Sequence, residues 1–266
     1  MPGTDVEELL SLAVRLAESA GALLLEALGS AHAGLGTKTS GTDMVSDVDR
    51  ASERLIVEAL GSARPHDGIL GEEGGAHHGT SGVRWVIDPL DGTTNYLYGQ
   101  PAFTVSIAAE VEGRSEVGVV AAPLLGELFV AVRGRGATRN GSPISCSAKD
   151  DLDTALVGTG FSYEAERRRH QAAALSVVLP RVRDIRRAGA ASLDLCWAAD
   201  GRLDGFYEHG LQPWDFAAGA LIASEAGAVV GDLDGGPPSG AFALATTPAL
   251  FEPLRQLLVE ARAGAG

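Results

Sequence analysis

The spacing of apolar positions at the start of the chain predicts an amphipathic helix over residues 5–28. Leucine, valine and alanine recur there every three or four residues, which places them on one helical face. Thr4 and Glu7 form a capping box at its start, and Gly29 is a C-cap at its end. The segment therefore has both the apolar face and the end signals of a core-covering helix.

A second helix is predicted from about Asp43 to Leu60, with a stop at Gly61. Its apolar stripe leaves Asp49 at the edge of the buried face. A carboxylate at that position needs a partner, because burying it alone is costly. Asp43 and Asp47 are explained more simply as residues of the first helical turn, where acidic side chains favour the helix dipole.

Runs rich in β-branched residues predict a sheet in the middle of the chain. The first is a buried strand from Val83 to Ile87. Between Ala102 and Ser147, short β-rich runs alternate with turn signals, and Asn140-Gly141 marks a hairpin. The pattern indicates an antiparallel sheet with strands at 103–107, 117–121 and 128–132.

The second half of the chain alternates predicted strands and helices, which implies a sheet covered by helices. The predicted strands are 155–157, 182–186 and 203–207, and the predicted helices are 164–179, 192–199, 216–226 and 248–263. Residues 235–240 are predicted to be a loop. No linker separates this half from the antiparallel region.

Composition and charge exclude several classes of function. A net charge of −14 argues against a general nucleic-acid binder. Two cysteines form no disulfide framework, no apolar run reaches membrane-spanning length, and a soluble cytoplasmic protein is expected. The concentrated basic region is explained most simply as a solvated surface, and consists of Arg167 to Arg169, Arg181, Arg183, Arg186 and Arg187.

Candidate chemistry centres on residues 85–95, where an apolar run meets two aspartates. Asp88 is expected where the strand ends, and Pro89 to fix a turn that directs Asp91 back towards it. Gly92 allows the backbone to approach a ligand, and the polar residues that follow it can open a helix. Two oxygen ligands beside a helix N-terminus can hold a divalent cation and a phosphate together.

A pair of glutamates, Glu72 and Glu73, follows a short apolar run. Adjacent side chains of a strand point to opposite faces, so only one of the two is expected to face a site directly. We assign Glu72 as the metal ligand and Glu73 as a residue behind it. His77 and His78 have no further ligand at metal-binding spacing and are expected at the surface.

The chain resembles the inositol monophosphatase family in four ordered stretches, over roughly residues 5–260. Asp88 to Asn95 matches the signature DPxDGTxN, and the other stretches are Asp43 to Asp49, Gly71 to Glu73, and Trp214 to Gly219 followed by Glu225 to Gly227. The resemblance implies a five-layer αβαβα sandwich. It would have an N-terminal α+β part (1–147) and a C-terminal α/β part (148–266) in one compact unit, with the site between them.

The resemblance further implies a magnesium-dependent, lithium-sensitive phosphatase that hydrolyses inositol monophosphate. Glu72, Asp88 and the carbonyl of Leu90 would hold one ion, and Asp88, Asp91 and Asp215 a second. A third, weaker ion could bind near Glu72. Four carboxylates carry a charge of −4, so two divalent cations are needed before a phosphate ester can approach.

Catalytic and substrate-binding positions are implied in the same way. Thr93, paired with Asp49, would orient a water or accept its proton beside the ion that Glu72 holds. The positions implied to contact the phosphate or the ring are Asp91, Gly92, Thr93, Gly189, Ala190, Ala191, Glu208 and Asp215.

Two departures and one loop complete the comparison with the family pattern. Ala190 replaces the usual serine or threonine and removes a side-chain hydrogen bond, whereas Ser46 replaces a threonine but keeps the hydroxyl. Lys38 lies in a loop that the resemblance implies is mobile and reaches the active site.

Alternatives stay open within the same chemistry and outside it. Fructose-1,6-bisphosphatases, histidinol-phosphatases and nucleotide 3′-phosphatases use similar metal motifs. The setting of Glu208 favours a compact polyol phosphate, and we see no insertion suited to a nucleotide base. Some bacterial members of the family act with the transcription machinery, so RNA or a transcription complex is an alternative partner. A homodimer is expected, without membrane association.

Overall fold

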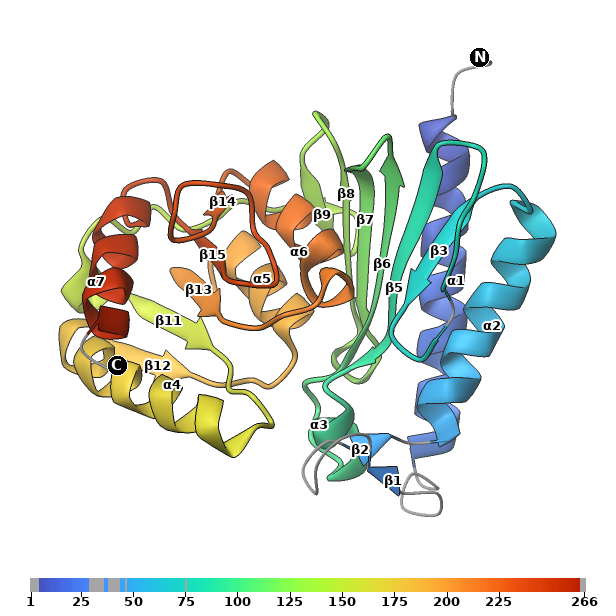
Figure 1. Cartoon of the computed structure of the whole chain (residues 1–266). Helices are drawn as coiled ribbons and strands as arrows, with labels where there is room; N and C mark the ends of the chain where they lie inside the picture. The colour runs from blue at the N-terminus through green and yellow to red at the C-terminus, as the bar shows by residue number, and fades with distance from the viewer. Residues whose placement is uncertain (1–4, 29–35, 38–43, 46, 75, 264–266) are drawn as a thin grey trace.

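The computed structural model describes residues 5–28, 36–37, 44–45, 47–74 and 76–263. Its elements stack in five layers, with a helical layer outside each sheet and one between the sheets (Figure 1). This order confirms the αβαβα sandwich that the resemblance implied. The helices of the three layers are α1 (Val6–Ala27) with α2 (Asp47–Ala63), α5 (Ala191–Ala199) with α6 (Pro213–Glu225), and α4 (Ala165–Val178) with α7 (Phe251–Ala263).

The larger sheet has eight strands in the order β10-β9-β8-β7-β6-β5-β3-β4. Its neighbours are antiparallel except β3 and β5, which are parallel. The predicted hairpin is confirmed, because Asn140 and Gly141 both have positive φ, at 50° and 76°. The strands are β3 (Gly68–Gly71), β4 (Ala76–His77), β5 (Val83–Asp91), β6 (Thr104–Val111), β7 (Arg114–Ala122), β8 (Glu127–Val132), β9 (Ala137–Arg139) and β10 (Ser142–Pro143).

The smaller sheet has five strands in the order β12-β11-β13-β15-β14, and two of them were not predicted. β14 and β15 are only three and four residues long and show no alternating pattern. Their antiparallel pairing extends the parallel trio of β12, β11 and β13. The strands are β11 (Leu156–Thr159), β12 (Asp184–Arg186), β13 (Gly205–Glu208), β14 (Val229–Gly231) and β15 (Ala243–Thr246).

Short elements complete the described chain. A two-stranded sheet pairs β1 with β2, and one helix of five residues, α3, follows β5. None of the described helices is both long enough and apolar enough to cross a membrane. The short elements are β1 (Gly36–Thr37), β2 (Met44–Val45), α3 (Thr93–Leu97), and the 3₁₀ helices η2 (Pro123–Leu125), η3 (Leu152–Thr154) and η4 (Leu179–Arg181).

Both N-terminal helices differ from prediction at their ends. The N-cap of α1 is Asp5, whose carboxylate accepts a 3.0 Å hydrogen bond from the amide of Glu7. Thr4, Gly29 and Asp43 lie outside the described residues. The predicted start of the second helix was wrong, because residues 44–45 form a strand and α2 begins at Asp47. The helix also continues through Gly61, since an exposed glycine weakens a helix without ending it.

The strand that carries the two aspartates is longer than predicted. β5 does not end at Asp88 but runs on to Asp91, with a shift of register against β6 between these residues. Pro89 has no amide hydrogen to donate to a ladder, which fits its place inside this irregular stretch. The irregularity presents both carboxylates and the Leu90 carbonyl at one end of the sheet.

Small residues let the middle helices lie close to both sheets. Gly118 of β7 faces α6 so closely that a Cβ there would lie 2.8 Å from the carbonyl oxygen of Ala218. At Gly219 a Cβ would lie 2.8 Å from the Cβ of Leu195 in α5. A single buried apolar cluster joins strands of both sheets through these helices, from Val86 to Phe206. The close packing holds the ends of both sheets against a common space.

This packing predicts that a side chain added at Gly118 lowers the stability of the protein, whereas one added at Gly61 raises it. Gly118→Val should lower the free energy of unfolding by about 1–3 kcal/mol, because the layers must separate to admit the side chain. Gly61→Ala is the matched control: no atom lies within 4 Å of the added methyl, and the change should raise stability by roughly 0.5–1 kcal/mol. Urea unfolding of both variants measures the two values. A Gly118→Val protein as stable as the parent would contradict the close approach of α6 to β7.

Candidate active site

An acidic cavity of about 130 Å³ lies where the ends of the two sheets approach each other. It contains all five positions proposed as metal ligands and most of the positions proposed to contact substrate. Ala190 is not among its lining residues: it is buried, and its Cβ packs against Gly92. The lining residues are Glu72, Asp88, Leu90, Asp91, Gly92, Thr93, Gly160, Phe161, Tyr163, Arg187, Gly189, Ala191, Glu208, Leu211 and Asp215.

The end of β5 supplies the centre of this cavity. The carboxylate of Asp88 accepts a 3.0 Å hydrogen bond from the amide of Leu90, which fixes the turn between the two aspartates. Asp91 accepts hydrogen bonds from the amide and the hydroxyl of Ser192, at 2.8 and 2.6 Å. Because Ser192 lies in the first turn of α5, the positive end of that helix holds Asp91 in place.

Asp215 reaches the same cavity from the first turn of α6. Its carboxylate accepts a 2.6 Å hydrogen bond from the amide of Gln212, and the two residues form a capping box. The carbonyl of the preceding residue, Trp214, accepts a hydrogen bond from Ser106 of β6. The helix start is therefore tied to the larger sheet, and Asp215 is directed towards the aspartates of β5.

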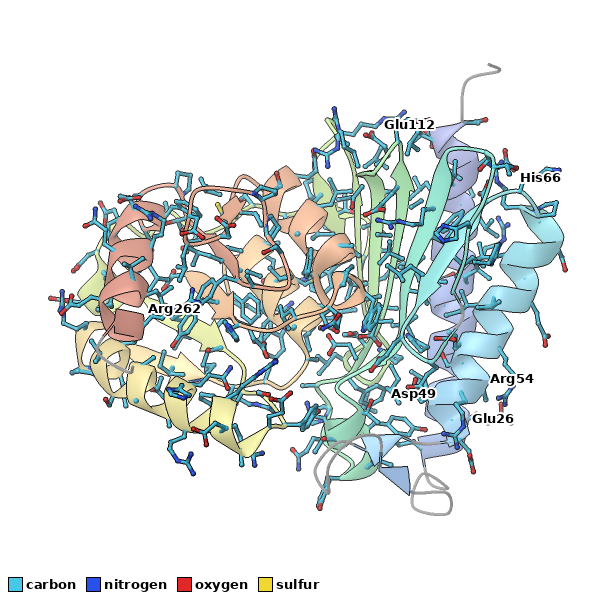
Figure 2. All side chains as sticks on the ribbon, in the orientation of Figure 1. Glu26, Asp49, Arg54, His66, Glu112 and Arg262 are labelled. Atoms are coloured by element: carbon cyan, nitrogen blue, oxygen red, sulfur yellow. The ribbon has the colours of Figure 1, made fainter. Side chains whose placement is uncertain are left out.

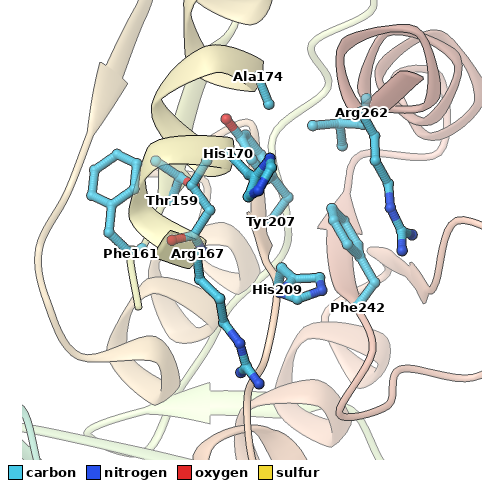
Figure 3. A pocket seen from close by; sticks show the side chains of 12 residues that line it. Thr159, Phe161, Arg167, His170, Ala174, Tyr207, His209, Phe242 and Arg262 are labelled. Atoms are coloured by element: carbon cyan, nitrogen blue, oxygen red, sulfur yellow. The ribbon is translucent and has the colours of Figure 1, made fainter. Parts of the chain in front are cut away.

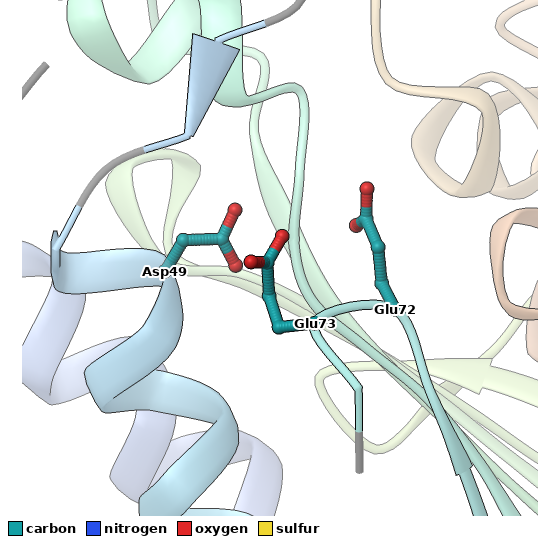
Figure 4. Close-up of side chains that lie close together, drawn as sticks. All are labelled: Asp49, Glu72 and Glu73. Atoms are coloured by element: carbon teal, nitrogen blue, oxygen red, sulfur yellow. The ribbon is translucent and has the colours of Figure 1, made fainter. Parts of the chain in front are cut away.

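A second acidic group lies beside the cavity, formed by Asp49, Glu72 and Glu73. One oxygen from each of the three lies within 4.8 Å of the others. Figure 4 shows the carboxylates of Asp49 and Glu73 turned towards each other, with Glu72 beside them. Asp49 is fully buried at the start of α2, whereas Arg54 lies on the outer side of that helix (Figure 2).

Of the two glutamates, Glu72 lines the cavity and Glu73 lies beside Asp49, but the alternation of a strand is not the cause. They follow β3 in a bend, so the alternation of side chains along a strand does not apply to them. The amide of Glu73 donates a 2.7 Å hydrogen bond to Glu53, whose carboxylate packs against Gly71. A Cβ at Gly71 would lie 2.8 Å from that carboxylate, which explains the glycine before the pair.

Thr93 lies between the cavity and Asp49. Its hydroxyl is 3.0 Å from the carbonyl oxygen of Leu90 and 3.4 Å from a carboxylate oxygen of Asp49. A hydroxyl has a single proton to donate, so the shorter contact, to Leu90, is the stronger hydrogen bond. Its lone pairs are left to accept a hydrogen bond from a group in the cavity.

Burial and mutual repulsion raise the pKa values of the clustered acids. Burial raises the pKa of Asp88 well above its usual range, and the charges of Glu72, Asp91 and Asp215 add to the effect. Burial raises the pKa of Asp91 to about 6, although the hydrogen bonds from Ser192 oppose the shift. The pKa of Asp215 is also well raised, by burial and then by Asp91. Among the described lining residues only Arg187 carries a positive charge.

Glu208 faces this cluster from the smaller sheet. Burial raises its pKa to about 8, the charge of Asp91 adds to this, and Arg187 opposes it. Its carboxylate lies against Gly160, where any Cβ would collide with it. The oxygen-only donor set and the uncompensated negative charge fit a cavity that receives divalent cations.

Several residues of the site were not identified from the sequence. Ser192 and Gly160 act through contacts that join distant segments, and no local pattern marks them. Arg187 was assigned to a solvated basic surface, but it lines the cavity. Lys38 and Ser46 lie outside the described residues. His77 and His78 are exposed, as expected.

Comparison with known proteins agrees with the geometry. A model of the Inositol monophosphatase family matches residues 5–263. An inositol-1-monophosphatase from Mycobacterium leprae is 44% identical over 96% of this chain and 94% of its own length. The Nus factor SuhB of Escherichia coli K12 is 43% identical over 86% of each chain. The solved structure of a Thermotoga maritima IMPase covers 97% of this chain and 100% of its own, with a TM-score of 0.90 and 30% identity.

The raised pKa of Glu208 predicts how the stability of the metal-free protein depends on pH. Below about pH 4.5 the carboxyl is protonated in both states and has no effect on stability. Between that pH and about 8, the unfolded chain releases a proton that the folded chain retains, so the parent loses stability as pH rises. Glu208→Gln should therefore become more stable relative to the parent as pH rises from 4.5 to 8.

Thermal unfolding in excess chelator, at several pH values, measures this difference. Glu58→Gln is the control, because Glu58 is exposed on α2 and its replacement should leave the pH profile of the parent unchanged. A stability difference between Glu208→Gln and parent that does not vary with pH would contradict the raised pKa.

Proposed function

The chain belongs to the inositol monophosphatase family and is a phosphatase; from that premise we propose that it uses magnesium to hydrolyse inositol monophosphate to inositol and phosphate. The observation that carries the proposal is the acidic cavity. It gathers four carboxylates and one carbonyl on one side and presents Glu208 on the other. Its size suits a compact phosphate ester.

The donor set supports magnesium. Mg²⁺ prefers carboxylate, carbonyl and water oxygens, and these residues offer no nitrogen or sulfur ligand. We assign Glu72, Asp88 and the Leu90 carbonyl to one ion, and Asp88, Asp91 and Asp215 to a second. The group of Asp49, Glu72 and Glu73 is suited to a third, weaker ion. Bound magnesium would neutralise the carboxylates, make a water more acidic and stabilise the leaving oxygen.

Thr93 and Asp49 are proposed to handle the proton of the attacking water. Since the Thr93 hydroxyl donates towards the Leu90 carbonyl or Asp49, its lone pairs can accept a hydrogen bond from that water. We propose that the amides at Gly92 and Thr93 bind the phosphate. Gly92 has a φ of 87°, a conformation that side chains disfavour, and a Cβ there would approach the Ala102 carbonyl to 2.8 Å.

Glu208 is proposed to accept hydrogen bonds from the hydroxyl groups of the alcohol. It needs to be ionised for its strongest hydrogen bonds, although repulsion from Asp91 helps to raise its pKa. Cations held at Asp91 would remove that repulsion. Gly189 and Ala191, which line the cavity, are proposed to contact the ring by shape, since neither has a polar side-chain group, whereas Ala190 packs behind them against Gly92.

The chain is further proposed to be a cytoplasmic homodimer in which residues 1–147 and 148–266 form one cooperative unit. The apolar cluster that joins Val86 of the first part to Phe206 of the second supports the last point.

A role in transcription is the second candidate, because relatives 42–43% identical to the chain carry the name Nus factor SuhB. The basic region around Arg167 to Arg187, as far as the structure describes it, does not favour a role in transcription. Arg169 pairs with Glu166, Arg181 with Glu260 and Arg186 with Asp184, so much of its positive charge is already matched. Salt-dependent RNA or polymerase binding that survives Asp88→Asn would support this role.

The proposal predicts that magnesium is required and that lithium inhibits. Asp88→Asn should abolish phosphate release, because this carboxylate is shared by both proposed ions. The variant should stay folded and should lose most of the rise in melting temperature that magnesium gives to the parent. Asp153→Asn, at an exposed acid, is the control and should retain both properties. Full activity in excess chelator would contradict a metal-dependent mechanism.

A second prediction concerns Thr93. Thr93→Ala should lower kcat by about 10²–10⁴, the usual contribution of general acid–base help, with little change in KM. Thr93→Ser keeps the hydroxyl and should retain most of the activity. Steady-state kinetics of both variants test this, and an unchanged kcat in Thr93→Ala would remove the hydroxyl from the mechanism.

The proposed role of Glu208 predicts that this residue contributes to substrate preference. Glu208→Gln keeps the size of the side chain but weakens an acceptor worth about 1–3 kcal/mol, so kcat/KM for inositol 1-phosphate should fall roughly 5- to 150-fold. Glycerol 2-phosphate, which presents fewer hydroxyls, should lose much less. Equal losses for both substrates would mean that Glu208 supports the metal site instead of the ring. A wider panel with fructose 1,6-bisphosphate, histidinol phosphate and adenosine 3′,5′-bisphosphate separates the related phosphatases.

A further inference from the structure

A second cavity, of about 350 Å³, lies between α4 and α7 on the outer side of the smaller sheet. It is larger than the acidic cavity, and its volume is in the range of small-molecule sites. Figure 3 shows its side chains converging from both helices and from the sheet that the helices cover. The lining residues are Thr159, Gly160, Phe161, Arg167, His170, Gln171, Ala174, Tyr207, His209, Phe242, Leu258 and Arg262.

Two parallel aromatic rings line this cavity. The rings of Tyr207 and Phe242 lie parallel, with an interplanar angle of 1° and centroids 6.2 Å apart. Phe161, Ala174 and Leu258 complete an apolar wall. Such a surface suits a planar apolar body, because stacking and burial both favour it.

The rim of the cavity is basic, in a chain whose net charge is −14. Arg167 comes from α4 and Arg262 from α7, and Figure 3 shows them on either side of His209. Burial lowers the pKa of His209, and the charges of Arg262 and Arg167 lower it further. Among the described residues that line the cavity none is acidic. Arg167 is paired with Glu164 outside it, at 3.1 Å.

The two cavities are chemically distinct although they adjoin. Of the described residues, the two cavities share Gly160 and Phe161 alone. Along the extended chain at β13, Glu208 lines the acidic cavity while Tyr207 and His209 line the other one. This follows from the alternation of side chains in an extended segment. The proposed metal ligands take no part in the second cavity.

From these observations we propose that the cavity between α4 and α7 is a binding site for a small organic anion with a planar apolar body. The body would lie against Tyr207 and Phe242, and its carboxylate, sulfonate or phosphate group would meet Arg167 and Arg262. His209 donates or accepts a hydrogen bond between them, according to the ligand. This site is separate from the one that hydrolyses phosphate esters.

The test uses 2-naphthalenesulfonate, which is planar, anionic and not a phosphate ester, and its neutral sulfonamide as a matched probe. Binding is measured by fluorescence and calorimetry on the full chain in excess chelator, where the acidic cavity repels anions. We expect one molecule of sulfonate per chain with a Kd of about 1 mM or below, and binding of the sulfonamide at least about fivefold weaker. Asp88→Asn should bind the sulfonate like the parent.

Variants locate the site. Arg262→Ala and Arg167→Ala should each weaken binding of the sulfonate about 10-fold, and Ala174→Phe should block both probes by filling the cavity. The controls are Arg169→Ala on α4 and Arg255→Ala on α7, which carry the same charge on the same helices outside the cavity and should bind like the parent. Unfolding curves show that each variant is folded.

Four results would overturn the proposal. One is the absence of saturable binding by the parent, and another is equal affinity for the charged and neutral probes. The third is a loss of sulfonate binding when the protein is concentrated enough to form a larger species. That loss would mean that a second copy of the chain occupies this face. Wild-type affinity in both Arg167→Ala and Arg262→Ala would likewise reject the assigned site.

Discussion

The convergence of four carboxylates on one cavity is the constraint on which the arrangement of the site depends. Glu72, Asp88, Asp91 and Asp215 share a cavity of about 130 Å³, where charge is costly without partners. Backbone amides hold three of them: Leu90 for Asp88, Ser192 for Asp91 and Gln212 for Asp215. The raised pKa values of these aspartates show that the amides position the groups without offsetting their burial. Clustered carboxylate oxygens of this kind can bind a divalent cation.

Small residues make that convergence possible. The acids come from different layers, so the layers must approach more closely than large side chains allow. Gly118 meets Ala218, Gly219 meets Leu195, and Gly160 meets the carboxylate of Glu208. The abundance of glycine and the scarcity of aromatic residues therefore allow the layers to pack closely. Small side chains keep the layer of α5 and α6 thin, so that residues of β5 and β13 can line one cavity.

Residues at the end of β13 line two cavities of opposite charge. Glu208 faces the acidic cavity, while Tyr207 and His209 face an apolar cavity whose rim carries Arg167 and Arg262. Extended backbone alternates its side chains, so adjacent residues can meet different chemistry at no structural cost. Among the described residues, Gly160 and Phe161 line both cavities. An anion in one cavity and a cation in the other would be held a short distance apart by one strand.

The sequence by itself determined the features that depend on near neighbours along the chain. Helical periodicity, the Asn140-Gly141 hairpin and the paired aspartates of β5 are local, and the order of the motifs identified the layered fold. Tertiary structure decided the rest. Glu72 lines the cavity and Glu73 lies beside Asp49 because a bend follows β3, and Arg187 reaches the site only through the packing of the smaller sheet. β14 and β15 exist because each pairs with a partner, and the cavity between α4 and α7 exists because two helices distant in sequence meet over one sheet. No pattern within a short window contains that information, since it lies in which segments pack together.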